Sequence, residues 1–316
     1  MIRDVNMAGL LVFLSVLALF LTIAYALFYT VFQRNRHTLG EESMLPGGKQ
    51  YEPYAESILR RVKSILSIRY ELVSTLSWDG LRLYGKYYHT EDGAPLVIFF
   101  HGYRSNSIRD GNGAFVLSKE RGYNVLMVDQ RAHGKSEGRV MTFGLKERFD
   151  CLQWIFYARE RFGKDIPILL MGLSMGAATV LMATGEELPE NVRCVIADCP
   201  FSSPREIIQS VMKKRGYPVG IFYPIARFAA AVFGGFELEE TTALEAVKKS
   251  RVPILVIHGE DDHFVPCDMG KACFEACLSQ KQLFTVKGAG HGLCYCVDEQ
   301  GYMENVNCFL DKIMGR

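Results

Sequence analysis

Residues 166–178 read IPILLMGLSMGAA, and this stretch joins an apolar run directly to a helix-forming segment through a single serine. The run 166–171 has the composition of a buried strand, and the following segment, AATVLMATGEEL, is rich in helix formers. The Gly-x-Ser-x-Gly pattern between them predicts a tight strand-to-helix turn. Gly172 and Gly176 would leave room for neighbouring backbone, and Ser174 would project at the carboxyl edge of a sheet. A packing turn that merely contains a serine is the alternative, and the rest of the chain decides between the two.

Short apolar runs alternate with amphipathic segments along most of the chain. Nearly continuous apolar runs predict parallel strands that are covered on both faces, and the alternation predicts a doubly wound α/β sheet. We also expect an antiparallel hairpin at one edge, with a two-residue turn at Asp79-Gly80. The predicted parallel strands are 96–101, 124–129, 166–172, 191–198, 253–258 and 282–287, the hairpin strands are 71–78 and 81–89, and amphipathic segments include 146–162 and 267–278.

An uncharged segment near the N-terminus predicts a membrane anchor. Residues 8–32 exceed the roughly 20 residues that cross a bilayer core, whereas a signal peptide has an apolar core of about 7 to 15 residues. We therefore predict a tail over 1–7 and a transmembrane helix over 8–32, which makes the protein single-pass. Arg34 and Arg36 follow the helix and Arg3 precedes it, and this balance favours a cytoplasmic catalytic domain by the positive-inside rule.

Composition narrows the functional classes. A net charge of +1 gives no electrostatic case for nucleic-acid binding. The nine cysteines show no disulfide-framework spacing, which agrees with a reducing compartment. Two close cysteine pairs lack the Cys-x-x-Cys spacing of a zinc knuckle, so we predict neither a metal site nor an organic cofactor. These pairs are Cys273/Cys277 and Cys294/Cys296.

The domain order follows from these segments. Residues 33–70 form a polar juxtamembrane linker followed by a helix over about 53–68, and residues 71–316 form the catalytic domain. About fifty residues separate Asp198 from Pro253, more than one crossover helix requires. We interpret the region of about 200–250 as a lid whose apolar underside covers a binding pocket, and an ordinary pair of packing helices is the alternative. Its large apolar residues are Ile221, Phe222, Tyr223, Phe228, Phe233 and Phe236.

A serine nucleophile needs a base, and the base needs an orienting acid. Asp261 and Asp262 follow the strand 253–258, and His291 follows the last strand. The carboxyl ends of these strands meet at the edge where Ser174 is expected, and the order serine, aspartate, histidine is the one this kind of turn predicts. These residues form the candidate catalytic triad.

Several of the seven histidines compete for the role of base. His291 is favoured because it lies beyond the last strand, between glycines that let its loop turn the ring toward Ser174. His133 and His263 lie on loops at the same edge, and spacing alone does not exclude them.

The negative charge that develops on a substrate carbonyl needs hydrogen-bond donors, usually two backbone N–H groups. One is expected from Met175, the residue after the serine. Our candidate for the other is Tyr103, in the loop HGYRSNS after the strand 96–101. These two N–H groups form the predicted oxyanion hole.

Five signatures in order carry a family resemblance: HGYRSNS, DQRAHGKSEG at 129–138, GLSMGA, HGEDDHFVP and GAGHG. Over residues 71–314 the sequence resembles the α/β-hydrolase superfamily, and within it the membrane-anchored hydrolases of the serine aminopeptidase S33 and lysophospholipase-like group. The resemblance implies the α/β-hydrolase fold with a helical lid insertion. Through the pattern G-x-x-D-x-x-V-P it selects Asp262 as the triad acid. The loop 129–138 looks like the family's D-x-R-G-x-G-x-S motif, with Ala132 at a glycine position, and is expected to help place the oxyanion loop.

The sequence thus predicts a membrane-anchored serine hydrolase that cleaves carboxylic esters through an acyl-enzyme, with a small-molecule or lipid-like acyl ester as substrate. An aminopeptidase or thioesterase with the same triad is one alternative, and the acidic segment FELEE at 236–240 keeps the aminopeptidase open. A catalytically silent, membrane-tethered binding protein on the same fold is the other.

Overall fold

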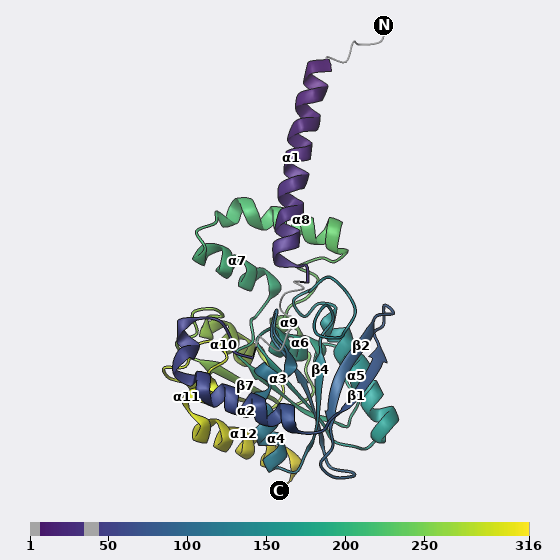
Figure 1. The fold of residues 1–316 in the computed structure, drawn as a ribbon, viewed down its shortest axis with the longest axis vertical. Helices are drawn as coiled ribbons and strands as arrows, with labels where there is room; N and C mark the ends of the chain where they lie inside the picture. The colour runs from purple at the N-terminus through teal and green to yellow at the C-terminus, as the bar shows by residue number, and fades with distance from the viewer. Residues whose placement is uncertain (1–6, 35–43, 316) are drawn as a thin grey trace.

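An eight-stranded, mostly parallel sheet forms the framework of the protein (Figure 1). The computed structural model describes residues 7–34 and 44–315, so most of the predicted tail, with Arg3, and also Arg36 lie outside the described residues. The spatial strand order is β1-β2-β4-β3-β5-β6-β7-β8, in which β2 pairs antiparallel with both neighbours and the other pairs are parallel. The predicted α/β class and the antiparallel N-terminal hairpin are confirmed. The strands are β1 Glu71–Leu76, β2 Arg82–Tyr88, β3 Leu96–Phe100, β4 Asn124–Asp129, β5 Ile168–Leu173, β6 Val192–Asp198, β7 Ile254–Gly259 and β8 Lys281–Val286.

Helices cover both faces of the sheet. Helices α5, α6, α9 and α10 pack on one face, and α3, α4, α11 and α12 pack on the other, with α2 outside α4. Neighbouring residues of one strand therefore enter different cores, as Ile98 and Phe99 of β3 do. This explains why the central strands are apolar without alternation. The helices are α2 Ala55–Ser67, α3 Ser107–Asp110, α4 Asn112–Glu120, α5 Glu147–Phe162, α6 Met175–Ala183, α9 Ala243–Val247, α10 Cys267–Ala276, α11 Cys294–Val297 and α12 Glu299–Met314.

The hairpin turn differs from the prediction. Leu76 pairs with Arg82, so the connection is a loop over residues 77–81 and not a two-residue turn. Gly80 does adopt a positive φ of 86°. The Asp79 carboxylate, however, binds both terminal nitrogens of Arg131, at 3.0 and 3.1 Å. This ion pair attaches the wider turn to a distant loop.

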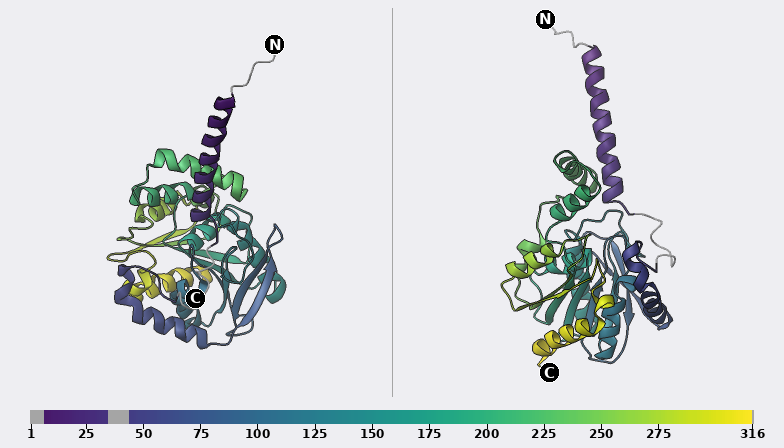
Figure 2. Two further views of the ribbon diagram at one scale, coloured as in Figure 1. Left: turned by 45° about the horizontal axis from the view of Figure 1, so that its top comes forward. Right: turned by 90° about the vertical axis from the view of Figure 1, so that its left-hand side faces the viewer.

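The first helix, α1 Met7–Val31, is long and apolar enough to cross a membrane by length and composition. Its first half extends away from the domain (Figures 1 and 2), and residues 7–19 are exposed. Its end is anchored in the domain, where Phe28 and Phe32 are buried. The segment after α1 is attached as well, because Arg34 donates to the backbone oxygens of Gly134 and Ser136. The part of the predicted linker next to α1 is thus docked on the domain.

The insertion between β6 and β7 contains α7 Pro204–Lys214 and α8 Val219–Gly234. The lid interpretation placed its apolar side chains over a pocket. Instead, α8 packs against α1: the rings of Phe228 and Phe20 lie 5.2 Å apart, and those of Phe233 and Tyr25 lie 5.4 Å apart. No described residue of 204–250 lines the cavity beside Ser174. The predicted helical insertion is thus present, and its apolar side chains contact α1.

Candidate active site

Ser174 lies at the turn between β5 and α6 with φ 56° and ψ −116°, a strained conformation for a residue with a side chain. The strain is held by the packing of α6 on the sheet. A Cβ on Gly172 would lie 2.3 Å from the Gly176 carbonyl oxygen, and a Cβ on Gly176 would lie 2.0 Å from that of Phe100. The Ser174 N–H donates to the Asp198 carbonyl at 2.8 Å. The glycines therefore allow the close backbone contact that presents Ser174, as the sequence predicted.

Ser174, His291 and Asp262 form one hydrogen-bonded chain. The Ser174 Oγ lies 2.9 Å from His291 Nε2, and His291 Nδ1 lies 2.7 Å from Asp262 Oδ2. A proton on Nδ1, donated to the carboxylate, leaves Nε2 free to accept the serine proton; this tautomer is assigned from the hydrogen bonds. The structure thus brings together the three residues that the sequence singled out, from the ends of β5, β7 and β8.

The Asp262 carboxylate is held on both oxygens. Its Oδ1 accepts from the backbone N–H groups of Phe264 and Val265, each at 2.8 Å, and its Oδ2 lies 3.5 Å from Nε2 of the buried His258. Burial alone would raise the pKa of Asp262, but the charge and hydrogen bonds of His291 and His258 outweigh it and hold that pKa well below its usual range. Asp262 is therefore ionised at neutral pH and can stabilise a cationic His291.

The two histidines that spacing left open as bases do not contact Ser174. His133 is buried, with Nδ1 bonded to the Arg131 carbonyl and Nε2 accepting the Arg104 N–H at 3.0 Å. Burial lowers the pKa of His133 well below its ordinary value, so it is neutral. His263 is exposed next to Asp262 and has no hydrogen bond to a described residue. Through its hydrogen bond with the Arg104 N–H, His133 instead supports the loop that contains Tyr103.

The candidate oxyanion donors, the N–H groups of Tyr103 and Met175, belong to two segments next to Ser174. In the loop after β3, the Gly102 N–H donates to Asp110 and the Arg104 N–H to His133, whereas the Tyr103 N–H has no partner among the described residues. The Met175 N–H is the first of α6 and has no partner within that helix. Gly102 lies against the serine, since a Cβ on it would be 3.4 Å from Ser174 Cβ. Asp110, which fixes this loop, was missed because nothing in its local sequence distinguishes it.

The side chains of this oxyanion loop reach the end of α1. The Tyr103 hydroxyl donates to the Val31 carbonyl at 2.7 Å, and Arg104 Nη2 donates to the Thr30 carbonyl at 2.6 Å. The Tyr103 ring also stacks on Phe143 at 5.2 Å. These bonds satisfy carbonyls that every helix leaves open at its C-terminus. The end of the apolar helix and the loop beside Ser174 are therefore one packed unit.

The loop 129–138 contacts the oxyanion loop, as the resemblance implied. Gln130 donates from its backbone and its side chain to His101, and His133 accepts from Arg104. Ala132 has φ 61°, in the left-handed region that favours the family's usual glycine. The alanine keeps the backbone path of the motif at some cost in strain.

A cavity of about 220 Å³ opens beside Ser174 and His291. One wall comes from the segment before and within the short 3-10 helix η3, Lys49–Tyr54, which sequence reasoning assigned to the linker. Tyr51 of this helix donates to the His291 carbonyl at 2.9 Å and so holds the histidine loop. The FELEE segment that kept an aminopeptidase open does not line this cavity. The lining residues are Pro46, Gly47, Tyr51, Ile58, Gly102, Tyr103, Ser105, Arg109, Asp110, Asn112, Leu173, Ser174, Phe264, His291, Gly292 and Cys296.

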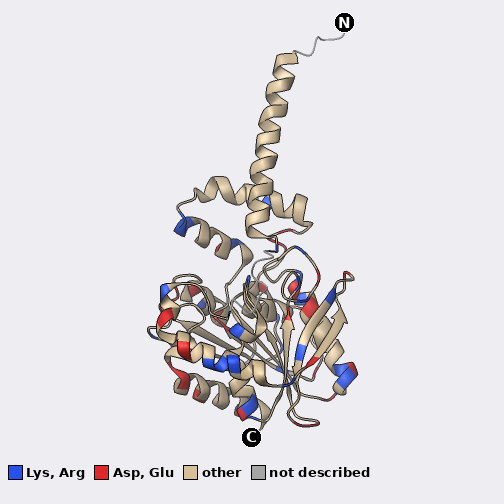
Figure 3. Cartoon of the chain, viewed as in Figure 1, with Lys and Arg blue, Asp and Glu red and all other residues tan. Residues whose placement is uncertain are grey.

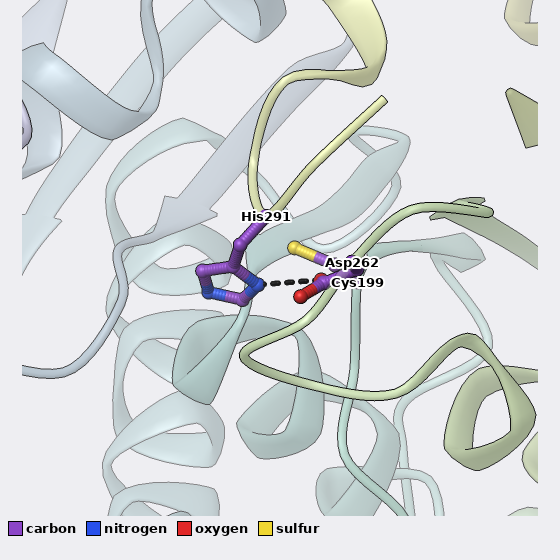
Figure 4. A group of neighbouring side chains, drawn as sticks. All are labelled: Cys199, Asp262 and His291. Atoms are coloured by element: carbon purple, nitrogen blue, oxygen red, sulfur yellow. Dashed lines mark hydrogen bonds and ion pairs between the residues drawn. The ribbon is translucent and has the colours of Figure 1, made fainter. Parts of the chain in front are cut away.

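Within the described residues, one group of metal-binding side chains comes close together: Cys199, Asp262 and His291, with donor atoms within 4.8 Å of one another (Figure 4). Burial, together with the nearby Asp198 and Asp262, raises the pKa of the Cys199 thiol well above its usual value, so the thiol stays protonated and is a poor ligand. Both oxygens of Asp262 and both ring nitrogens of His291 already have hydrogen-bond partners. The donor set fits a hydrogen-bonded chain better than a metal site. Among the residues that the structure describes, the cysteine pairs Cys273/Cys277 and Cys294/Cys296 belong to no such group.

Comparisons with known proteins agree with the fold. The sequence model described as the alpha/beta hydrolase fold matches residues 95–250. YqkD of Bacillus subtilis (strain 168) is 28% identical over 231 residues, 72% of this chain and 75% of YqkD. Lysophosphatidylserine lipase ABHD12 of Xenopus tropicalis is 27% identical over 201 residues, 60% of this chain and 48% of that protein. The solved structure of the Pyrococcus furiosus esterase Pf2001 superimposes with a TM-score of 0.65 at 25% identity, covering 79% of this chain and 94% of the esterase.

The fold and these similar proteins define the class. The chain has the α/β-hydrolase fold, and the proteins similar to it include an esterase and a lysophosphatidylserine lipase.

Proposed function

We propose that this protein is a membrane-anchored serine hydrolase that cleaves carboxylic esters. Ser174 Oγ attacks the ester carbonyl carbon while His291 Nε2 takes its proton, and the N–H groups of Tyr103 and Met175 bind the oxyanion. The tetrahedral intermediate collapses to an acyl-enzyme, and His291 gives the proton to the leaving alcohol. A water then attacks the acyl carbon with His291 again as base, which releases the acid and restores Ser174.

One observation carries this proposal: Ser174, His291 and Asp262 are joined by hydrogen bonds of 2.9 and 2.7 Å. A hydroxyl is a weak nucleophile until a neighbouring base removes its proton, and the base works best when an acid fixes its tautomer. Asp262 supplies that acid, because its two backbone hydrogen bonds fix the carboxylate. A silent binding protein on the same fold has no chemical need for this chain of groups.

An ester with a lipid-like acyl chain is the proposed substrate. Similarity to a lysophosphatidylserine lipase and to an esterase supports this class. The cavity mixes apolar lining, such as Ile58, Leu173 and Phe264, with polar groups beside Ser174. An aminopeptidase would need a free carboxylate for the substrate amine. The carboxylate that lines the cavity, Asp110, already binds the Gly102 N–H and Arg109. An ester is therefore the better fit. A thioester would undergo the same acyl transfer.

The membrane anchor is part of the proposal, with α1 as a retained single-pass span and the catalytic domain in the cytoplasm. The support is the docking of its last turn, since Phe28 and Phe32 are buried and Tyr103 bonds to Val31. Removal of α1 as a signal peptide would strip these contacts from the domain. Protease digestion of intact cells and of opened membranes tests the orientation: protection in intact cells alone supports it, and cleavage in intact cells contradicts it.

The test of the chemistry is hydrolysis of p-nitrophenyl esters of increasing chain length by the full chain in detergent micelles. Ser174→Ala should abolish turnover of every ester, whereas Ser67→Ala, an exposed serine at the end of α2, should leave turnover unchanged. Turnover by the Ser174→Ala protein at the wild-type rate would refute the nucleophile. A rate that rises with chain length supports the lipid-like substrate, and a rate confined to the acetate ester contradicts it.

A further inference from the structure

Helix α8 is apolar on every side, yet protein covers only one side of it within the described residues. Its sequence, VGIFYPIARFAAAVFG, contains one charged residue, Arg227. A helix that is apolar all round belongs in a protein core or in a membrane. The buried side consists of Tyr223, Ala226, Ala229 and Ala230, and the outer side carries Ile221 and Val232, which are 61% and 56% exposed.

The position of α8 along α1 indicates what covers this outer side. In all views α8 lies at the level of the half of α1 nearest the domain (Figures 1 and 2). Phe228 contacts Phe20, and Phe233 contacts both Tyr25 and Phe28. The contacts of α8 therefore begin near the middle of the apolar helix and not at its end.

The part of α1 that precedes its contact with α8 is too short to cross a bilayer. From Met7, where α1 begins, to Phe20 the helix rises about 20 Å at about 1.5 Å per residue. The hydrocarbon core is about 30 Å thick and needs about 20 residues, which counted from Met7 end near Ala26. Phe20 then lies about 9 Å inside the core, and Phe228 lies beside it.

We propose that α8 lies in the leaflet nearest the catalytic domain, as a second membrane-embedded element beside α1. This inference rests on the proposed membrane span of α1. With 16 residues α8 is too short to cross the bilayer itself. A depth of about 9 Å instead matches helices that lie in the interface plane with an apolar side about 5 to 10 Å below the headgroups.

The charges around α8 fit this placement. Arg227 pairs with Glu237 at 2.8 Å and with Glu239 at 3.3 Å, so its charge is balanced by the protein. Three exposed basic residues, 213–215, end α7 and begin the loop to α8, and Figure 3 shows blue at this end of α7 beside the tan α8. Basic residues and tyrosine are the side chains that anchor a protein at lipid headgroups, and the exposed Tyr217 lies two residues after Arg215.

The placement brings the cavity beside Ser174 close to the membrane surface. Lys214 Nζ donates to the carbonyl of Phe264 at 3.2 Å, and Phe264 lines that cavity. The basic residues 213–215 would lie at the lipid headgroups. The side chain of Lys214 then reaches from that level to the rim of the cavity. A lipid ester in the leaflet nearest the domain would therefore lie close to this cavity.

Depth-dependent quenching of tryptophan fluorescence tests the inference. The full chain with Trp78→Phe, which removes the exposed tryptophan, is reconstituted in phosphatidylcholine vesicles with bromine on the upper part of one acyl chain. Three variants are compared with this parent: Ile221→Trp on α8, Val16→Trp on the exposed half of α1, and Phe156→Trp on α5 as the water-exposed control. We expect the bromolipid to quench the first two and to leave the third unchanged.

The outcomes separate this inference from the proposals it builds on. Quenching of Val16→Trp without quenching of Ile221→Trp overturns the α8 placement and leaves the anchor intact. If neither the Val16→Trp nor the Ile221→Trp protein is quenched, both the membrane anchor and the α8 placement are overturned. Protection of Ile221→Trp from bromolipid and from aqueous iodide alike would show that a protein covers α8, which also overturns the inference. Hydrolysis of p-nitrophenyl butyrate by each variant reports separately on the proposed chemistry.

Discussion

Replacing Gly176 by alanine tests whether the close packing behind Ser174 is what the site depends on. The new Cβ would lie 2.0 Å from the Phe100 carbonyl oxygen and 2.7 Å from that of His101. An ordinary contact begins at 3.4 Å, so the start of α6 must move about 1.4 Å away from β3. Strand β3 is paired on both sides, with β4 and β5, so it cannot yield.

The shift would move Ser174 and the Met175 N–H together. Misplacement of reacting groups by about 1 Å can cost about a hundredfold in rate, and overpacking typically costs about 1 to 3 kcal/mol of stability. We therefore expect kcat/KM for p-nitrophenyl butyrate to fall by about a hundredfold or more, with a lower unfolding midpoint in urea. Gly220→Ala, in α8 with open space around the new Cβ, is the matched control and should leave kcat/KM unchanged. Wild-type activity and stability in Gly176→Ala would refute the packing argument.

Three further substitutions separate the parts of the site. Asp262→Asn should lower kcat by about 10⁴-fold because it disturbs the His291 tautomer. Asp261→Asn, at the exposed neighbouring residue, should have no effect. Equal effects of the two substitutions would contradict the assignment of Asp262 as the triad acid. Tyr103→Phe removes the hydrogen bond to Val31, worth about 0.5 to 1.5 kcal/mol, so kcat/KM should fall up to about tenfold; an unchanged value means that α1 does not position the loop. Burial lowers the pKa of His133, so the unfolded chain binds a proton there that the folded chain does not, and stability is lost as pH falls below about 6.5. When unfolding by urea is measured in micelles, the free energy of unfolding of His133→Gln should depend less steeply on pH, by up to about 1.4 kcal/mol per pH unit. An identical pH dependence in the two proteins would show that His133 is not its cause.

The sheet could be predicted because its strands are buried on both faces. Such strands read as short apolar runs, and β3, in which all five residues are buried, is the clearest example. The grouping of Ser174, Asp262 and His291 could also be predicted, since parallel strands end at the same edge of a sheet. This grouping needed only the order of the motifs and no knowledge of loop conformation.

The contacts made by the N-terminal region could not be predicted. Tyr51 contacts the loop of His291, 240 residues away in the sequence, and Asp79 pairs with Arg131. Such pairings depend on how distant loops meet, and polar residues in a linker carry no pattern that reveals it. The apolar residues of the insertion were recognised, but apolarity alone does not say which surface they cover. In the structure this surface is α1.

The central claim is that Ser174 forms a covalent acyl-enzyme. Its most direct test is mass spectrometry of the full chain after reaction with a fluorophosphonate, which forms a stable adduct with an activated serine. We predict one adduct per chain, on the peptide that contains Ser174, and its loss when His291 is replaced by alanine. An adduct on another residue, or ester hydrolysis that continues at the original rate after Ser174 has been modified, would contradict the account.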